Sequence, residues 1–315
     1  SKSIDPKYSS PLLYAKRDRK GPKGELVGSI ATAPREVDAI AIRNWQNIYD
    51  GNFDNLKQKA MDFVRDHPDG IPHNENFRID RITMEEVKKA CTQAKASVSG
   101  LDNWEPAELG MLSDAMYQEI ADLLNLIEDG APWPEAMDRA RAAYLSKNPN
   151  RTCEPLEYRV LMILPALYRR WASMRLEALE EWTEQWGSED FYAGNGAQGS
   201  EDAWYSLSSD IEEHRIKGED FVGGAVDISK CFDQISRELL YEIAKLAECP
   251  PKILDAYRRY QENLKLHNTI AKGIGRAFSR KCGIPQGDPL SMMFVALLMK
   301  PWMQECKALG AKVKI

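Results

Sequence analysis

The sequence predicts an α+β fold that is mostly helical and contains a small sheet. In several segments, apolar residues recur at every third or fourth position, which is the spacing that buries one face of a helix. Residues 221–228 alternate between two kinds of side chain instead, and this pattern is typical of a strand. Stretches that contain glycine and proline, such as 66–77 and 283–289, separate these segments and predict loops.

Two of the predicted helices carry start signals. Thr83 precedes Glu86 by three residues, which is the spacing of a capping box. Asp288 precedes Pro289, and this pair predicts an N-cap followed by the first residue of a deeply buried helix. The segments predicted to be helical are 34–52, 81–95, 106–124, 164–186, 201–215, 236–248 and 289–298.

The predicted strand over residues 221–228 has two different faces. Val226 and Ile228 lie on the face whose branched side chains pack against helices. On the other face, Gly223 and Ala225 lead to Asp227, and such small residues leave room for a ligand to approach the backbone. We therefore expect Asp227 to stand at the C-terminal edge of a strand.

The composition is that of an ordinary globular protein. Of the 315 residues, 43% are hydrophobic and 29% are charged. No apolar run approaches the roughly 18 residues of a membrane span, and the N-terminal residues contain no apolar signal core. We expect an intracellular protein, nuclear or cytoplasmic. The six cysteines and four histidines are scattered, which argues against a disulfide framework or a structural zinc site.

The net charge of −6 is unevenly distributed along the chain. Residues 1–24 carry +5 and residues 251–315 carry +8, so the residues between them carry −19. Such a chain can hold a polyanion only if its basic side chains line a common groove. The alternative is an acidic, solvated surface with basic ends, and charge alone favours it.

Two motifs together resemble the palm of a reverse transcriptase, closest to the type found in non-LTR retrotransposons and group II introns. In that family a strand ends in D-I-x-K-A-F-D, and here residues 227–233 read Asp-Ile-Ser-Lys-Cys-Phe-Asp. Later in the family comes G-x-P-Q-G-x-x-L-S, which residues 283–291 match. Each motif alone is moderately specific, but their order, spacing and context make a chance match improbable.

The resemblance covers residues 80–315, and weaker marks agree with it. Residues 99–104 resemble a turn before the fingers, residues 130–150 resemble the segment that ends in the first fingers lysine, and residues 158–173 resemble the Y-R-P-I segment. The implied fold is the fingers and partial palm of a right-hand polymerase, with a small antiparallel palm sheet and no thumb. The implied division is an N-terminal extension over 1–80, fingers over 81–220 and partial palm over 221–315.

The resemblance implies an RNA-directed DNA polymerase that adds dNTPs to the 3′-hydroxyl of a DNA primer on an RNA template. Two Mg²⁺ ions would serve the reaction, because hard cations prefer carboxylate and carbonyl oxygens. Asp227 would be the catalytic carboxylate and a metal ligand, and the carbonyl of Ile228 would be a second ligand. Phe232 occupies the position of the steric gate that favours dNTPs over rNTPs.

The remaining implied contacts of the dNTP come from the fingers and the second motif. Lys147 and Arg159 would bind the triphosphate, as a point charge and as a planar fork respectively. Gln286 and Gly287 would line the nucleotide pocket, beside Ile228 and Phe232. A possible endonuclease domain in the parent polyprotein is a further implied partner.

Several of these positions have another interpretation. Asp233 is better explained as a residue that caps the next helix or braces its turn than as a metal ligand. Phe232 could be a core residue, Lys147 and Arg159 could be solvated surface charges, and Arg151 competes with Lys147 for the phosphates. Asp227 itself could be a plain acid at a strand end.

The sequence also departs from the family pattern. Cys231 replaces the usual alanine, Val160 replaces the proline after Arg159, and Met292 replaces the proline after the second motif. The third palm motif, Ala-Asp-Asp, does not occur in the 315 residues. One aspartate should hold two Mg²⁺ ions poorly, so we expect this chain as given not to polymerise DNA.

Other classes of protein stay open at this point. A degenerate or domesticated fragment that binds RNA or a partner without catalysis is the main alternative. An RNA-dependent RNA polymerase shares the palm plan but fits Phe232 and the Pro-Gln-Gly loop less well. An unrelated Mg²⁺ phosphohydrolase would leave the motif at residues 283–291 unexplained.

Overall fold

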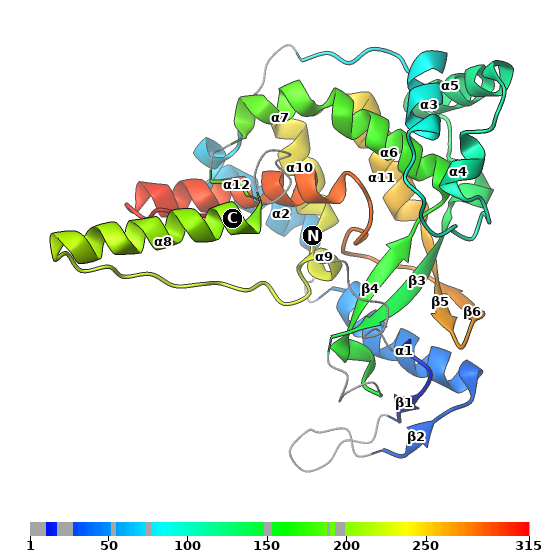
Figure 1. Ribbon diagram of the computed structural model, residues 1–315, viewed down its shortest axis with the longest axis horizontal. Coiled ribbons are helices and arrows are strands. Elements are labelled where there is room, and N and C mark those ends of the chain that lie inside the picture. The colour runs from blue at the N-terminus through cyan, green and yellow to red at the C-terminus, as the bar shows by residue number, and fades with distance from the viewer. Residues whose placement is uncertain are drawn as a thin grey trace.

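The computed structural model describes residues 11–17, 28–51, 55–73, 77–147, 153–187, 190–192 and 199–314. Over these residues the fold is α+β and mostly helical, with twelve α-helices, a four-stranded sheet and a short two-stranded one (Figure 1). This confirms the predicted class. The identity of the fold as fingers and palm, and the domain division, stay predictions.

The helices begin and end as follows: α1 Pro34–Tyr49, α2 Leu56–Asp66, α3 Met84–Thr92, α4 Pro106–Leu109, α5 Asp114–Glu128, α6 Ala166–Ala178, α7 Glu180–Trp186, α8 Ser200–Lys217, α9 Cys231–Gln234, α10 Arg237–Leu246, α11 Pro251–Asn263 and α12 Ser291–Ala308. The strands are β1 Ala15–Lys16, β2 Ile30–Ala31, β3 Arg139–Ser146, β4 Tyr158–Ile163, β5 Lys265–Ile270 and β6 Gly273–Phe278. A 3₁₀ turn, η5, covers Pro155–Glu157.

The four-stranded sheet has the order β4-β3-β5-β6 and is mixed. The pairs β3–β4 and β5–β6 are antiparallel hairpins, whereas β3 and β5 run parallel. The prediction of an antiparallel sheet was therefore wrong. Helices α6 to α11 separate β4 from β5, and this long connection lets the second hairpin dock in parallel on the first.

One face of the sheet packs on α1, which brings an early part of the chain into contact with β5 and β6. The contact includes a buried polar chain in which the Tyr144 hydroxyl donates to Asn268 Oδ1 at 2.8 Å. The Asn268 amide then donates to Asp38 Oδ1 at 2.9 Å. Because each buried polar group finds a partner, α1 is fixed in register on the sheet.

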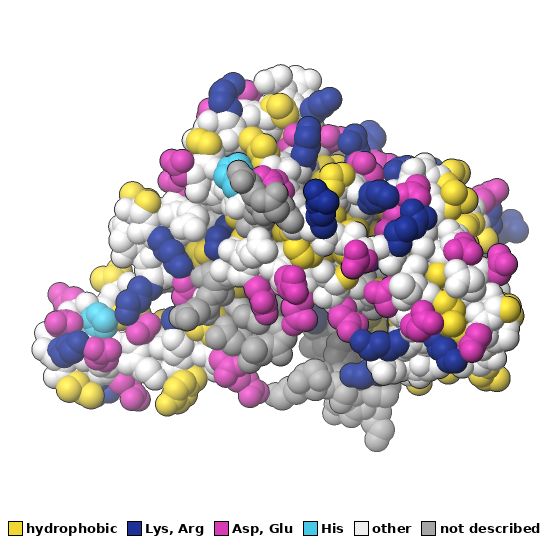
Figure 2. Space-filling model, turned by 90° about the horizontal axis from the view of Figure 1, so that it is seen from above, with side chains coloured by type: hydrophobic (Ala, Val, Ile, Leu, Met, Phe, Trp, Pro, Cys, Tyr) yellow, Lys and Arg dark blue, Asp and Glu magenta, His cyan; other side chains and the backbone are white. Residues whose placement is uncertain are grey.

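The opposite face of the sheet carries basic side chains. The strand registers place Arg139 beside Lys265 and Arg141 beside His267 on this face, and they add Arg159 from β4. The strands contribute no Asp or Glu to it. On the face of the molecule shown in Figure 2, acidic and basic side chains are interspersed.

Two predicted helices are interrupted in the structure. The segment that starts at Pro106 ends after one turn at Gly110, and α5 begins afresh where the Ser113 hydroxyl accepts from Met116 N at 3.4 Å. The long segment after Leu164 breaks at Leu179 into α6 and α7. The capping box is confirmed, since Glu86 N donates to the Thr83 hydroxyl and Glu86 Oε2 accepts from Thr83 N.

Residues 221–228 do not form a strand, so that prediction was also wrong. The segment is extended but has no strand partner, and Val222 and Val226 are 94% and 80% exposed. Figure 1 shows it running back from the end of α8, which projects from the body, towards α9. Alternating side chains do not make a strand without a neighbour to accept its backbone hydrogen bonds.

The core lies between the sheet, α1 and the helices α5, α6, α10, α11 and α12. Helix α12 is less enclosed than its composition predicts, because Met292 and Trp302 are partly exposed. None of the helices that the structure describes is long and apolar enough to cross a membrane.

Candidate active site

The turn before α9 is anchored by Lys230. This residue has a left-handed backbone conformation, with φ of 49°, which is unfavourable for residues other than glycine. Its ammonium lies 4.3 Å from the centroid of the Trp45 ring and donates to the Leu156 carbonyl at 2.8 Å. The turn is thereby tied to both α1 and η5.

Asp233, the second acid of the first motif, is buried inside the molecule. Its Oδ1 accepts from the Tyr49 hydroxyl at 3.3 Å. Burial raises the pKa of Asp233, and the charges of Lys230 and Arg280 partly oppose that shift. Helix α10 is capped by the Ser236 hydroxyl rather than by Asp233. The geometry is that of a residue bracing its turn.

The two motifs are in direct backbone contact. Gly283 N donates to the Ile235 carbonyl at 2.7 Å, and Ile284 N donates to the Phe232 carbonyl at 2.8 Å. Gly283 has φ of +80°, and a Cβ there would lie 2.6 Å from the Asp233 carbonyl oxygen. Only glycine allows so close an approach, so this residue holds the two loops together.

The second motif loop also lies along the free edge of β4. Met162 N donates to the Gln286 carbonyl at 3.0 Å, and a Cβ on Gly287 would lie 3.1 Å from the Met162 carbonyl oxygen. Asp288 Oδ1 accepts from Leu290 N at 3.1 Å. This bond closes the turn that leads into α12, but the helix begins at Ser291 with Leu290 as its N-cap and without a side-chain cap bond, so the predicted N-cap at Asp288 was wrong.

Lys147 and Arg159 lie on the same side of the β3–β4 hairpin and are exposed. Arg159 pairs with Leu145, and Lys147 N donates to the Glu157 carbonyl at 3.0 Å, just beyond the last strand pair. Burial lowers the pKa of Lys230, and the nearby charge of Lys147 lowers it further. Arg151, the competing residue, lies outside the described residues.

The structure therefore brings five of the predicted residues to one region. Phe232 is half-buried against the core, next to the loop that carries Gln286 and Gly287. That loop contacts the strand that carries Arg159, and Lys147 stands at the end of the same hairpin. A loop, a turn and a hairpin from distant parts of the sequence meet here.

Asp227 and Ile228 precede the turn that leads to α9, in the segment that has no strand partner. Asp227 is exposed there, with its charge near the Cys231 thiol, and the Ile228 carbonyl accepts from Cys231 N at 3.2 Å. Across the described residues, no three His, Cys, Asp or Glu side chains come together as a metal site. In this conformation the donors present do not fit two Mg²⁺ ions.

A buried polar layer behind the two loops was not predicted. The Arg280 guanidinium donates to Gln261 Oε1 at 3.1 Å, and Gln261 Nε2 donates to Asp288 Oδ2 at 3.2 Å. The Tyr168 hydroxyl donates to the same carboxylate oxygen at 2.8 Å. Burial raises the pKa of Asp288 to about 6. No periodic pattern in the sequence marks Arg280, because its burial depends on contacts with α10 and α11.

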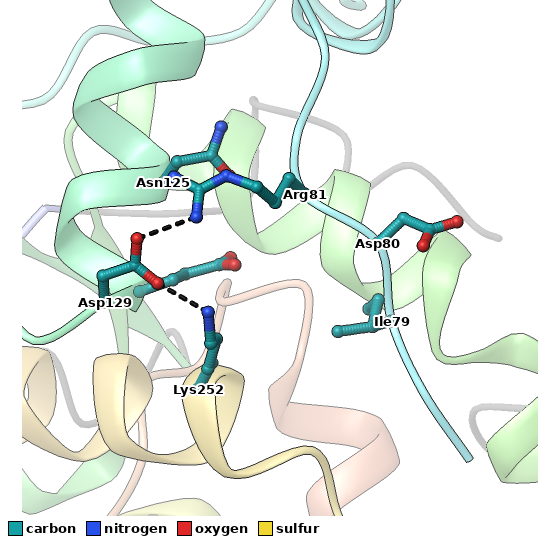
Figure 3. Close-up of a pocket in the computed structure, with 7 residues that line it drawn as sticks. Ile79, Asp80, Arg81, Asn125, Asp129 and Lys252 are labelled. Atoms are coloured by element: carbon teal, nitrogen blue, oxygen red, sulfur yellow. Dashed lines mark hydrogen bonds and ion pairs between the residues drawn. The ribbon is translucent and has the colours of Figure 1, made fainter.

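A small cavity of about 60 Å³ lies elsewhere, between α5, α11 and the segment before α3. Figure 3 shows Asp129 in it between Arg81 and Lys252, whose side chains bind the carboxylate at 2.9 and 2.6 Å. None of the predicted site residues lines this cavity. Arg81 and Lys252 are both bound to Asp129, which makes the cavity a poor site for an anionic ligand.

No protein-family model matches the chain, and no curated protein matches its sequence significantly.

Proposed function

We propose that the chain is the fingers and partial palm of an RNA-directed DNA polymerase, and that it binds a dNTP where the two motif loops meet the β3–β4 hairpin. One observation supports this above the others. Loops that resemble two separate polymerase motifs share backbone hydrogen bonds across Gly283 and Ile284. Two unrelated loops would have no reason to approach so closely that only glycine fits between them.

The residues around this junction suit a nucleotide triphosphate. Lys147 and Arg159 supply exposed cations for its phosphates. Phe232 offers a half-buried ring for the sugar, and Gln286 stands next to the free edge of β4. Mg²⁺ would neutralise the triphosphate when bound, but Asp227 and Ile228 alone are too few ligands to hold two ions.

A nucleic-acid partner is supported by the basic face of the sheet. Arg139, Arg141, Lys265 and His267 form two adjacent pairs on this face, with Arg139 also ion-paired to Glu135 at 3.1 Å, and Arg159 lies farther along the same face, opposite Leu145. Such a face attracts a phosphate backbone without reading its sequence.

Nucleotide binding is the first test. We expect a Mg²⁺-dTTP complex to quench the fluorescence of the tryptophans, of which Trp45 lies 4.3 Å from the Lys230 ammonium in the turn before α9. Lys147→Ala and Arg159→Ala should each weaken binding by about tenfold, the loss of about one charge-assisted contact. Lys57→Ala, an exposed lysine on α2, is the matched control. Equal affinities for all four proteins would contradict the proposed site.

Sugar selectivity tests the role of Phe232. A smaller side chain, as in Phe232→Val, should bring the affinities for dTTP and for the corresponding ribonucleoside triphosphate closer together.

A primer-extension assay on the chain as given should stay negative, because the Ala-Asp-Asp motif is absent from its sequence. Robust extension would refute the expectation of an inactive fragment.

The alternative, an RNA-binding fragment without catalysis, is favoured by the exposed and unpaired Asp227. On this reading RNA binds the basic face while dNTPs do not bind. Arg139→Ala and Lys265→Ala should then reduce the salt dependence of RNA affinity by about one unit of slope each, while Asp227→Asn leaves it unchanged. Binding of RNA with no binding of dTTP would decide for this function.

A further inference from the structure

Arg280 stands in the interior between the acids of the two motifs. Only 5% of its surface is exposed. On one side it reaches Asp288 through Gln261, and on the other its guanidinium lies 6.0 Å from the centroid of the Tyr49 ring. The Tyr49 hydroxyl donates to Asp233. A continuous buried path thus joins one motif to the other through Arg280.

The Arg280 side chain is poorly satisfied for a buried charge. Its Nη2 donates to Gln261, but its Nε and Nη1 have no hydrogen-bond partner among the described residues. Burial lowers the pKa of Arg280, and the neighbouring charge of Arg237 lowers it further. A buried charge with so few partners is costly, so its presence calls for a role beyond packing.

Arg237 differs from Arg280 although the two lie close together. Arg237 forms an ion pair with Glu262 at 3.1 Å, and it donates to the carbonyls of Arg280 and Gln261. It therefore supports the backbone of the layer with its own charge balanced locally. Within the described ranges Arg280 forms no ion pair, and its charge acts on both Asp233 and Asp288.

We propose that Arg280 is a positioning residue that couples the two motif loops, holding Phe232 and Gln286 in a fixed relation. This proposal depends on the proposed function in one respect only, which is that the coupling shapes the nucleotide pocket. The coupling itself is a property of the fold. If the two loops are coupled, a substitution of Arg280 loosens both of them together, because the Arg280 charge acts on one acid in each motif.

Several other titratable groups surround this layer and must be considered in any measurement of pH dependence. They are Tyr49 from α1, Tyr144 and Lys147 from the β3 region, Tyr168 from α6, Lys230 and Cys231 from the turn and α9, Arg237 from α10, Tyr257, Tyr260 and Glu262 from α11, Cys282 from the second loop, and Asp102 and Asp138.

Amide hydrogen exchange at pH 7 tests the coupling without any nucleotide. In Arg280→Met, exchange in residues 229–235 and 283–290 should rise together by about tenfold, which corresponds to about 1.4 kcal/mol of local opening free energy. Exchange in α3 and α5 should not change. Arg280→Lys, which keeps the charge, should restore part of the protection in both loops.

A pH profile separates coupling from simple loss of packing. Burial raises the pKa values of Asp288 and Asp233, and the Arg280 charge partly opposes that rise. The titration of Asp288, followed through the pH dependence of unfolding, should therefore move to higher pH in Arg280→Met and not in Arg280→Lys. A purely structural role would shift stability equally at every pH.

A second variant covers the case in which Arg280→Met does not fold. Gln261→Met breaks the link between Arg280 and Asp288 without removing a charge, and it should loosen both loops in the same way. If exchange rises in one loop only, or evenly over the whole molecule, Arg280 does not couple them. Failure of the wild-type protein to bind dTTP would refute the proposed function and leave this result standing.

Discussion

The molecule contains two buried clusters around an arginine, and they differ in how well the charge is matched. Between α5 and α6, Arg175 binds Glu128 through two hydrogen bonds of 2.6 Å. The indole of Trp171 donates to the same carboxylate at 2.8 Å. Both charged side chains are almost completely buried, and the pair is closed on itself.

The layer around Arg280 has the opposite character. In the part of the chain that the structure describes, the Arg280 guanidinium makes one hydrogen bond, to the neutral Gln261. Asp288 and Asp233 are bound by the hydroxyls of Tyr168 and Tyr49. Burial raises the pKa values of Asp233 and Asp288, as expected where a carboxylate lacks a close cation. Shifted carboxylates in a poorly matched layer are more typical of functional sites than of structural ones.

The largest effect should come from breaking the matched pair. Arg175→Met leaves Glu128 buried without its cation, and we expect a loss of about 3–5 kcal/mol in the free energy of unfolding. Urea denaturation measures it.

The control for this prediction is the double variant with Glu128→Leu. Replacing both charges by apolar groups of similar size should recover most of the lost stability. If Arg175→Met is as stable as the wild type, Glu128 does not depend on Arg175 to balance its charge.

A substitution at Gly283, where the two motif loops meet, should have the next largest effect on stability. Gly283→Ala places a methyl group 2.6 Å from the Asp233 carbonyl and adds strain at φ of +80°, so we expect a loss of about 3 kcal/mol. Gly218→Ala has a similar φ of +68° but open space around it, and it should cost about 1 kcal/mol. Equal losses in thermal or urea denaturation would mean that the loops are not in close contact.

The pH dependence of stability tests the mismatch in the second region. The folded-state pKa of Asp288 is about 6, above the ordinary value of 3.8. Folding therefore favours its protonated form, and the stability that this acid contributes is fully present below about pH 4 and is lost as the pH rises through 6. The loss should be about 1–3 kcal/mol.

Asp288→Asn removes this titration. We expect the difference in unfolding free energy between Asp288→Asn and the wild type to change between pH 4 and pH 7, with the variant gaining relative to the wild type as the pH rises. A difference that does not depend on pH would show that Asp288 titrates normally.

The smallest effect should come from residues 221–228, the segment that leads to the turn before α9. Val226 is exposed, so Val226→Thr should change the unfolding free energy by less than about 0.5 kcal/mol. Val160→Thr is the matched control, because Val160 is buried in β4, and it should cost about 1–3 kcal/mol. A comparable loss in Val226→Thr would mean that residues 221–228 are held against a neighbour.

Much of the local structure could be predicted because its causes are local. The capping box at Thr83 and Glu86 and the helical stripes depend on residues within a few positions of one another. The boundaries were less predictable, since Gly110 and Leu179 interrupt segments whose apolar spacing continues through them.

The candidate site was predicted only in part. The motif residues identified Gly283, Gln286 and Phe232, and the structure adds the backbone contacts that join their loops. Asp227 was expected at the edge of a strand that the structure does not contain. Arg280 was missed altogether, because a single arginine carries no sign in the sequence that it is buried.

The sequence by itself determined the helical periodicities, the capping box and the order of the motifs, since each needs only the spacing of residues along the chain. The tertiary structure alone decided the parallel docking of β5 on β3, the exposure of residues 221–228 and the burial of Arg280. These features depend on which distant backbone groups and charges become neighbours. Strand pairing and the desolvation of a charge depend on residues that are distant in the sequence, and not on the segment that is paired or buried.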